Sequence, residues 1–217
     1  FSMPAEASPV QRAATLRQYR NYANLAESYS TIPSRFLTIT HGVSAVGKSS
    51  VAMRLVEALG AIRLRSDVIR KQLFGQQTAE NAVGDGIYNV DASAATYSKL
   101  HELAGIVLRA GFPVVIDATY LKREQRDAAA QVAEATGVPC LILDCTAPDA
   151  VIEGWLAHRK SVGTDPSDAT LEVVKAQQAS REPLGADEIL RSKRVETNNS
   201  KSLDTLIADI RQRLPGL

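Results

Sequence analysis

The sequence has few cysteines, few aromatic residues and no strong charge of either sign. Its two cysteines, Cys140 and Cys145, lie in one apolar stretch. This favours buried thiols in a reducing compartment over a disulfide or a metal site. Lysine and arginine number 25 against 24 acidic residues, and there is no extended basic tract. The charge balance therefore argues against long duplex DNA or RNA as the main partner.

Long hydrophobic runs are also missing. No segment approaches the ~18 apolar residues that a membrane-spanning helix needs, and no charged-then-apolar leader opens the sequence. We therefore expect a cytoplasmic protein with no membrane partner. Hydrophobic residues make up 45% of the 217, enough for one substantial core. The expected organisation is an N-terminal tail and helix over 1–34, followed by one domain over 35–214.

The sequence does contain a regular alternation of strand and helix patterns. Strands are expected at 36–40, 61–65, 113–117, 138–145 and 194–197. Helices are expected at 10–29, from 48 to about 59, at 91–110, 122–136, 148–160 and 168–180, and around 203–210. The third and fourth strands are nearly continuous apolar runs, as is typical of strands covered on both faces. The alternation predicts an α/β fold with a five-stranded parallel sheet flanked by helices. Residues 75–89 are expected to form one long loop.

One motif carries most of the functional information. The run Gly42-Val43-Ser44-Ala45-Val46-Gly47-Lys48-Ser49-Ser50 contains the full G-x-x-x-x-G-K-[ST] pattern between a strand and a helix. Its glycines let the backbone wrap around phosphate oxygens, and the helix adds its positive N-terminal end. Lys48 would reach the β- and γ-phosphates, and the Ser49 hydroxyl would ligate Mg²⁺. We therefore predict ATP and Mg²⁺ as cofactors; no Asn-Lys-x-Asp pattern for guanine follows.

An aspartate and an arginine follow the second expected strand. Ligands of doubly wound sheets bind at the carboxyl ends of strands, so Asp67 should face the γ-phosphate. There it would accept the proton of an acceptor hydroxyl. Arg70 would share a helical face with Asp67 and bind the acceptor. Alternatively, Ser66 or Asp67 is only a helix N-cap.

These residues also carry a resemblance. Residues 42–50 together with 64–71 resemble the P-loop kinases that include zeta toxins, gluconate kinase, chloramphenicol phosphotransferase and polynucleotide 5′-kinases. The run from Val115 to Leu121 with Arg126, and later Gln177 and Glu182-Pro183-Leu184, are similar to predicted bacterial kinases often fused to an aminoglycoside phosphotransferase-like domain. The resemblance implies a P-loop NTPase fold of the nucleotide kinase type, with a helical lid at about 148–182. It also implies that Asp67 is the general base and that such a partner domain is possible.

Three further positions complete the expected metal and acceptor sites. Asp117 ends a Walker-B-like strand and would hold a water of the Mg²⁺ shell, although it could also cap the next helix. Thr119 is expected to line the acceptor pocket. Arg126 is a second acceptor-binding candidate, with a plain surface position as the alternative.

The lid and the adenine site depend on the resemblance. Arg159 matches the second lid arginine of related kinases and would stabilise the transition state. Trp155 stands where those kinases usually have the earlier lid arginine. Thr197 and Asn198 lie where such folds usually pass the adenine base.

These assignments predict an ATP-dependent kinase that phosphorylates a hydroxyl of a small molecule, such as a sugar, nucleotide-sugar or antibiotic. A polynucleotide 5′-hydroxyl kinase is one alternative. It requires a basic channel, for which the sequence offers Arg63, Arg65, Arg70 and Lys71. A nucleotide-binding regulatory module with little turnover is the other alternative, favoured by the missing lid arginine.

Overall fold

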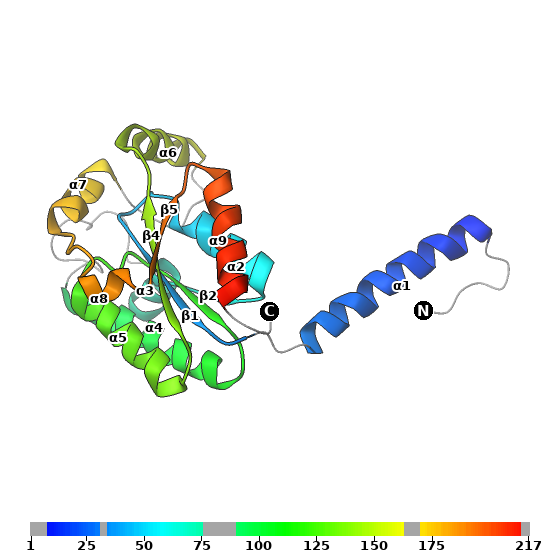
Figure 1. The fold of residues 1–217 in the computed structure, drawn as a ribbon. Helices are drawn as coiled ribbons and strands as arrows, with labels where there is room; N and C mark the ends of the chain where they lie inside the picture. The colour runs from blue at the N-terminus through cyan, green and yellow to red at the C-terminus, as the bar shows by residue number, and fades with distance from the viewer. Residues whose placement is uncertain (1–7, 31–33, 76–89, 163–169, 214–217) are drawn as a thin grey trace. The chain divides into compact units, whose positions relative to one another are not determined.

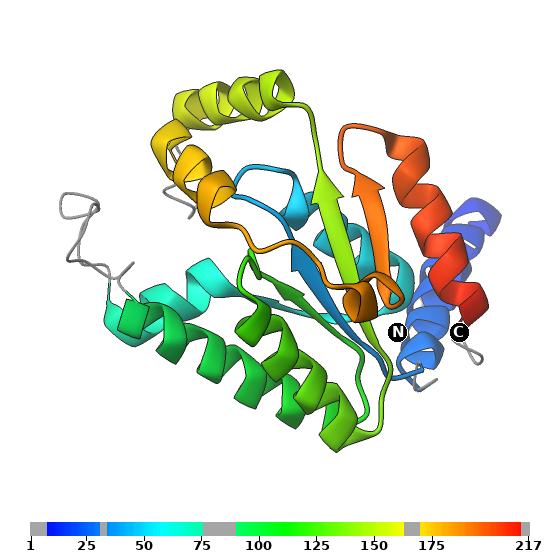
Figure 2. The ribbon, with the colours of Figure 1, turned by 60° about the vertical axis from the view of Figure 1, so that its left-hand side comes forward.

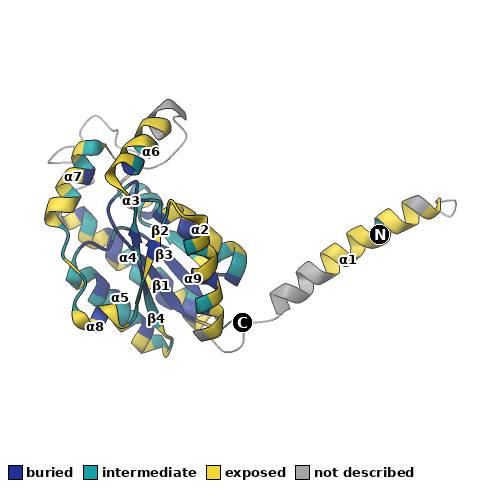
Figure 3. Cartoon of the chain, turned by 45° about the horizontal axis from the view of Figure 1, so that its top comes forward, coloured by how far each residue is buried: buried dark blue, intermediate teal, exposed yellow. Residues whose placement is uncertain are grey.

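The computed structural model describes residues 8–30, 34–75, 90–162 and 170–213. It falls into two compact units, Phe1–Ile32 and Pro33–Leu217. The described part of the first unit is helix α1 (Pro9–Ser30). Three of its large side chains, Leu16, Tyr19 and Tyr22, are about half exposed, and most of the helix is drawn as exposed in Figure 3. Among the helices described in both units, none is long and apolar enough to cross a membrane.

The second unit is built on a five-stranded sheet with the strand order β2-β3-β1-β4-β5 (Figure 1). The strands are β1 (Leu37–His41), β2 (Ile62–Arg65), β3 (Val114–Asp117), β4 (Cys140–Thr146) and β5 (Ser192–Glu196). Every neighbouring pair is parallel. The predicted fold class is therefore confirmed, with strand boundaries shifted by one or two residues.

The helices of this unit follow the strands in alternation. They are α2 (Lys48–Leu59), α3 (Ser66–Phe74), α4 (Val90–Arg109), α5 (Arg123–Thr136), α6 (Asp149–Val162), α7 (Leu171–Ser180), α8 (Ala186–Ile189) and α9 (Ser200–Arg213). Periodicity did not predict α3 or α8, because both are too short to repeat an apolar pattern. The expected long loop lies, from residue 76 onward, outside the described residues.

Helices cover both faces of the sheet (Figure 2). On one face α2 and α9 contribute Leu55 and Leu206 to the core. On the other, α4 and α5 contribute Leu100 and Ala129. Ile39 of the central strand β1 is completely buried, as expected for a strand covered on both sides.

The parallel arrangement gathers the carboxyl ends of the strands at one edge. The turns that follow β1, β2 and β3 all lie at this edge, and α6 and α7 stand beyond it (Figures 1 and 2). This is the edge at which doubly wound sheets bind their ligands.

Candidate active site

The phosphate loop, residues 42–50, connects β1 to α2 through a backbone that favours glycine. The φ angle is 138° at Gly42, 60° at Ala45 and 86° at Gly47. A Cβ added to Gly47 would lie 2.8 Å from the Cβ of Thr197, and one added to Gly42 would lie 2.7 Å from the Cys145 carbonyl oxygen. Both glycines are therefore required by their φ angles and by close packing. Left-handed positions of this kind are typical of loops whose N–H groups bind an anion.

The phosphate loop lines a pocket of about 200 Å³ at the carboxyl edge of the sheet. The same pocket is lined by Asp67 at the start of α3 and by Asp117 and Thr119 at the end of β3. Lys48 is a lining residue too, so the lysine and the carboxylate expected to act together share one cleft. One pocket thus unites the phosphate loop, the base candidate, the metal candidate and one acceptor candidate.

Lys48, the first residue of α2, is held inside the loop. Its side chain is only 8% exposed, and its Nζ donates to the Val43 carbonyl oxygen at 2.6 Å. An ammonium group carries three donors. The loop therefore contains a buried positive charge placed to meet a phosphate that enters the pocket.

Ser49 and Asp117 form the pair expected to hold Mg²⁺. The Ser49 hydroxyl donates to Asp117 Oδ2 at 2.8 Å, and the carboxylate is 6% exposed. A hydroxyl and a carboxylate are oxygen ligands of the kind Mg²⁺ prefers, and the ion keeps several waters of its own. These two side chains therefore fit the predicted metal.

Arg63 of β2 binds the same carboxylate oxygen. Its Nε donates to Asp117 Oδ2 at 3.1 Å, and its Nη2 makes a second, shorter contact. In the sequence, Arg63 was considered only as part of a basic channel. No local signal could reveal this pairing, because Asp117 lies on the neighbouring strand 54 residues later.

Asp67 lies in the first turn of α3 and is held in a fixed orientation. Its Oδ1 accepts from the Val68 backbone N–H at 2.8 Å and from Arg65 Nε at 3.0 Å, while Arg65 Nη2 contacts Oδ2. The N-cap position of α3 is occupied by Arg65. Asp67 is thus a pocket residue within the helix, oriented by a two-pronged arginine contact.

Arg70 and Thr119 meet residues of α4 next to the pocket. Arg70 is 8% exposed and donates to Ser93 Oγ at 3.3 Å. Thr119 Oγ1 lies 3.1 Å from the hydroxyl of Tyr97, which also accepts the Tyr120 N–H at 3.1 Å. Burial raises the pKa of Tyr97, so its phenol stays protonated. Ser93 and Tyr97 therefore support the acceptor candidates from behind.

The structure gives Arg126 a different place from the one expected. The side chain is fully buried, and all five of its donors have partners. Two go to the carboxylate of Glu188, and three go to the carbonyl oxygens of Tyr120, Glu182 and Pro183. With every donor occupied, Arg126 cannot contact an acceptor, and we leave it out of the proposed site. The alternative prediction, a plain surface position for Arg126, is also wrong, because the side chain is buried.

Glu188 is the acidic partner of Arg126, and its carboxylate stays ionised. Burial alone would raise the pKa of Glu188, but hydrogen bonds from Arg126 and from the Gly185 N–H hold it below its usual value. The pair links α5 to α8, and it fixes the segment through which the chain returns from the predicted lid to β5. Its role is structural.

Two of the remaining candidates, Thr197 and Asn198, are not among the residues that line the pocket. The Thr197 hydroxyl donates to the Val46 carbonyl oxygen at 2.7 Å, and the Thr146 carbonyl oxygen lies 3.2 Å from the same Oγ1, so the side chain supports the phosphate loop. Asn198 is exposed beside it. Arg159 belongs to α6, but its side chain lies outside the described ones.

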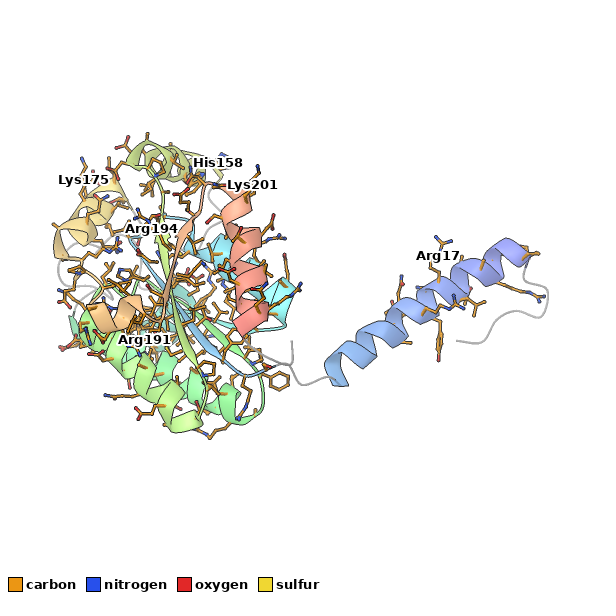
Figure 4. All side chains as sticks on the ribbon, viewed as in Figure 1. Arg17, His158, Lys175, Arg191, Arg194 and Lys201 are labelled. Atoms are coloured by element: carbon orange, nitrogen blue, oxygen red, sulfur yellow. The ribbon has the colours of Figure 1, made fainter. Side chains whose placement is uncertain are left out.

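Basic side chains stand around this end of the unit. Figure 4 labels His158 of α6, Lys175 of α7 and Lys201 of α9, all toward the carboxyl ends of the strands, whereas Arg191 lies at the opposite end of β5.

His41, the last residue of β1, is linked by hydrogen bonds to the chain after β3 and to the end of α7. It is fully buried, and its Nδ1 lies 2.9 Å from the Tyr120 carbonyl oxygen. Arg181 donates its Nε to His41 Nε2 at 2.9 Å and its Nη2 to Asp144 Oδ1 at 2.6 Å. Burial lowers the pKa of His41 to about 4, which leaves a neutral ring that donates through Nδ1 and accepts through Nε2.

The fold is shared with solved kinase structures. A putative kinase from Chloroflexus aurantiacus has a TM-score of 0.64 at 16% identity, covering 85% of this chain and 99% of that one. A gluconokinase from Sinorhizobium meliloti has a TM-score of 0.61 at 18% identity, covering 84% and 97%. The APS kinase of Mycobacterium tuberculosis, in complex with AMPPNP and APS, has a TM-score of 0.55 at 20% identity, covering 83% and 97%. These likenesses establish a P-loop kinase-like fold.

Sequence comparison adds longer relatives and a family. Uncharacterized proteins of Mycobacterium bovis and Mycobacterium tuberculosis are 29% identical over 146 residues, which is 66% of this chain and 29% of theirs. The chain thus spans less than a third of the length of these curated relatives. A family model described as an AAA domain matches residues 37–184. Since this match covers more than half of the chain and includes the phosphate loop, the protein belongs to that AAA-domain family.

Proposed function

We propose that this protein transfers the γ-phosphoryl group of ATP to a hydroxyl group of a small molecule. The observation that carries the proposal is the single pocket lined by both Lys48 and Asp67. A phosphate loop alone would suit any nucleotide-binding protein. A carboxylate in the same pocket adds a group that can take the proton of an attacking hydroxyl.

The phosphate side of the reaction is assigned to the loop. Its backbone amides and the N-terminal end of α2 would bind the phosphates, and Lys48 would neutralise part of their charge. Ser49 and Asp117 would hold Mg²⁺, the first directly and the second through water; the ion supplies charge neutralisation at the phosphate oxygens. Arg159 remains our candidate for a lid cation near the transferred group.

The acceptor side is assigned to the turns after β2 and β3. The acceptor oxygen would form a bond to the γ-phosphorus while the bond from that phosphorus to the β–γ bridging oxygen breaks and ADP leaves. The proton of the acceptor hydroxyl would pass to Asp67, whose orientation Arg65 fixes. Arg70 and Thr119 would hold the acceptor.

The small-molecule acceptor is preferred over a polynucleotide because of how the arginines are used. Arg63 is bound to Asp117, and Arg65 is bound to Asp67. Two of the four residues that a basic channel would need are therefore already paired with carboxylates. The name of one of the similar structures, a gluconokinase, agrees with a small acceptor.

Three predictions remain as they were made from the sequence. Thr197 and Asn198 are proposed to lie near the adenine base. An aminoglycoside phosphotransferase-like partner domain and a cytoplasmic location are also retained as predictions.

The test compares Asp67→Asn with the parent protein. Asparagine keeps an acceptor for the Val68 N–H but removes the base. We expect ATP affinity by calorimetry to stay within about threefold, and transfer from labelled ATP to a panel of hydroxyl acceptors to fall by about 10²–10⁴. Asp127→Asn, which removes a carboxylate bound to Arg123 on α5, is the matched control.

Two results would contradict the proposal. Equal transfer rates in Asp67→Asn and parent would leave only nucleotide binding, as in the regulatory-module alternative. Transfer to a polynucleotide 5′-hydroxyl, with none to small acceptors, would favour the polynucleotide kinase.

A further inference from the structure

One amide of the phosphate loop is bonded to the predicted lid. The Ser44 N–H donates to Oε1 of Gln177 at 2.7 Å. Ser44 lines the pocket, whereas Gln177 belongs to α7, 133 residues later in the chain. A loop of this kind normally offers its amides to phosphate oxygens. Here a side chain from another element takes one of them.

Ser44 lies in the half of the loop nearer the acceptor. The loop begins at Gly42, whose N–H donates to the Thr119 carbonyl oxygen at 3.0 Å. Further along the loop, Gly47 packs against Thr197, the residue that follows β5. The phosphate that is transferred must lie on the Thr119 side, because the acceptor binds there in the proposed function. Ser44 therefore belongs to the γ-phosphate end of the loop.

The packing of α7 aims Gln177 at the loop. Val174, three positions earlier on the same helical face, is 2% exposed and packs in the core with α2 and β5. The neighbouring Gln178 points elsewhere: it is exposed, and its Nε2 donates to Asp149 of α6 at 3.0 Å. The end of the helix is held by the bonds from Arg181 to His41 and Asp144. Gln177 is thus placed by a helix anchored on both sides of it.

The chemistry of the carboxamide suits a terminal phosphate. Because the Ser44 N–H is a donor, the atom that faces it must be the oxygen, so the amide nitrogen forms the other end of the group. That nitrogen carries two N–H donors. A glutamine can therefore hold the loop with one end and donate to a phosphate oxygen with the other, without adding charge.

We propose that Gln177 is the residue by which α7 positions the γ-phosphate end of the loop, and that it distinguishes ATP from ADP. The inference rests on the proposed function, since it assumes that the loop binds ATP. It deepens that function by giving the predicted lid a defined contact with the phosphate that is transferred.

The test measures the dissociation constants of ATP and ADP for Gln177→Glu and Gln177→Ala. Glutamate keeps an oxygen for the Ser44 N–H but places a negative charge beside the terminal phosphate. We expect Gln177→Glu to weaken ATP binding at least about tenfold and ADP binding less than about threefold. Gln177→Ala should weaken ATP binding about threefold to tenfold, with ADP again less affected. A thermal unfolding curve for each variant verifies folding.

Ala176→Glu is the matched control, because it adds the same charge one residue away at an exposed position of α7. It should change neither dissociation constant by more than about twofold. Two results would overturn the inference while leaving transfer by the parent protein intact: equal losses for ATP and ADP in Gln177→Glu, or equal dissociation constants in Gln177→Glu and Ala176→Glu. A parent protein that binds no ATP would instead overturn the proposed function, and this inference with it.

Discussion

Two arginine–carboxylate pairs in this protein use the same chemistry in different surroundings. Arg126 and Glu188 are both fully buried, and the arginine shares its donors between the carboxylate and three backbone carbonyl oxygens. Arg63 and Asp117 are 13% and 6% exposed, and the carboxylate also lines the pocket and accepts from Ser49. The Arg126–Glu188 pair is thus buried within the protein, whereas the Arg63–Asp117 pair borders the pocket where a ligand would bind.

The difference shows how position decides the role of an ion pair. A closed pair has no partner to exchange, so removing one member leaves a buried charge and costs stability. A pair at the wall of a pocket can give up part of its contact to a metal ion or a phosphate. We therefore expect the first pair to govern folding and the second to govern the metal requirement.

The largest effect is expected from breaking the closed pair. Arg126→Met should lower the free energy of unfolding by about 3–5 kcal/mol, because it leaves the buried Glu188 carboxylate with only the Gly185 N–H and the more distant Arg123, whose Nη1 lies 3.6 Å away. Urea unfolding of the variant and the parent measures the difference. Arg54→Met is the control, since Arg54 pairs with Asp204 on the surface and should contribute at most about 1 kcal/mol. Similar losses in the two variants would mean that Arg126 is not held as described.

An intermediate effect on stability is expected at His41, the buried last residue of β1. Its pKa of about 4 in the folded protein is below the unfolded value of about 6.5, so the unfolded chain binds the proton first. The stability that His41 contributes is therefore complete above about pH 6.5 and is lost as the pH falls toward 4. Between pH 7 and pH 5 this loss should reach about 2 kcal/mol.

Urea unfolding at both pH values tests this prediction. The His41→Gln variant should lose less stability than the parent over the same interval, because it has one titrating group fewer. His101, whose pKa burial also lowers to about 4, provides a second comparison through His101→Gln. Parallel pH profiles of His41→Gln and the parent would show that His41 does not titrate in this way.

The smallest effect is expected at the open pair. Arg63→Gln removes a positive charge from Asp117, so we expect the Mg²⁺ concentration for half-maximal ATP binding to fall about threefold to tenfold. Calorimetric titration of ATP at a series of Mg²⁺ concentrations measures this change. Arg54→Gln should leave it unaltered. A higher Mg²⁺ requirement in Arg63→Gln would mean that the arginine helps to hold the ion instead of competing with it.

Most of the fold could be predicted from the sequence because local pattern determines it. The apolar residues Val114, Val115 and Ile116 identify a strand covered on both faces, and glycines mark where helices end. The edge strand β5 was predicted to begin two residues late, because Ser192 and Lys193 carry no apolar signal. In that strand only Val195 is buried, so its position depends on pairing with β4.

The site was predictable where its residues are adjacent in the sequence, and less so where they are distant. The phosphate loop and Asp67 follow their strands directly, and the structure places them in one pocket. Glu188, the carboxylate partner of Arg126, and Gln177, the partner of Ser44, lie 62 and 133 residues away, so no local pattern could reveal these pairings. Arg126 was assigned to the acceptor for this reason. Gln177 was named only as part of the resemblance to bacterial kinases, and no role was predicted for it.

The strand order separates the parts of the site into independent stretches of chain. The phosphate loop follows β1, the acceptor side follows β2 and β3, and the helices α6 and α7 lie in the chain between the neighbouring strands β4 and β5. Each stretch leaves and rejoins the sheet without passing through the others. Acceptor preference and nucleotide handling can therefore diverge separately among homologues, and a chimera that exchanges one stretch should keep the register of all five strands.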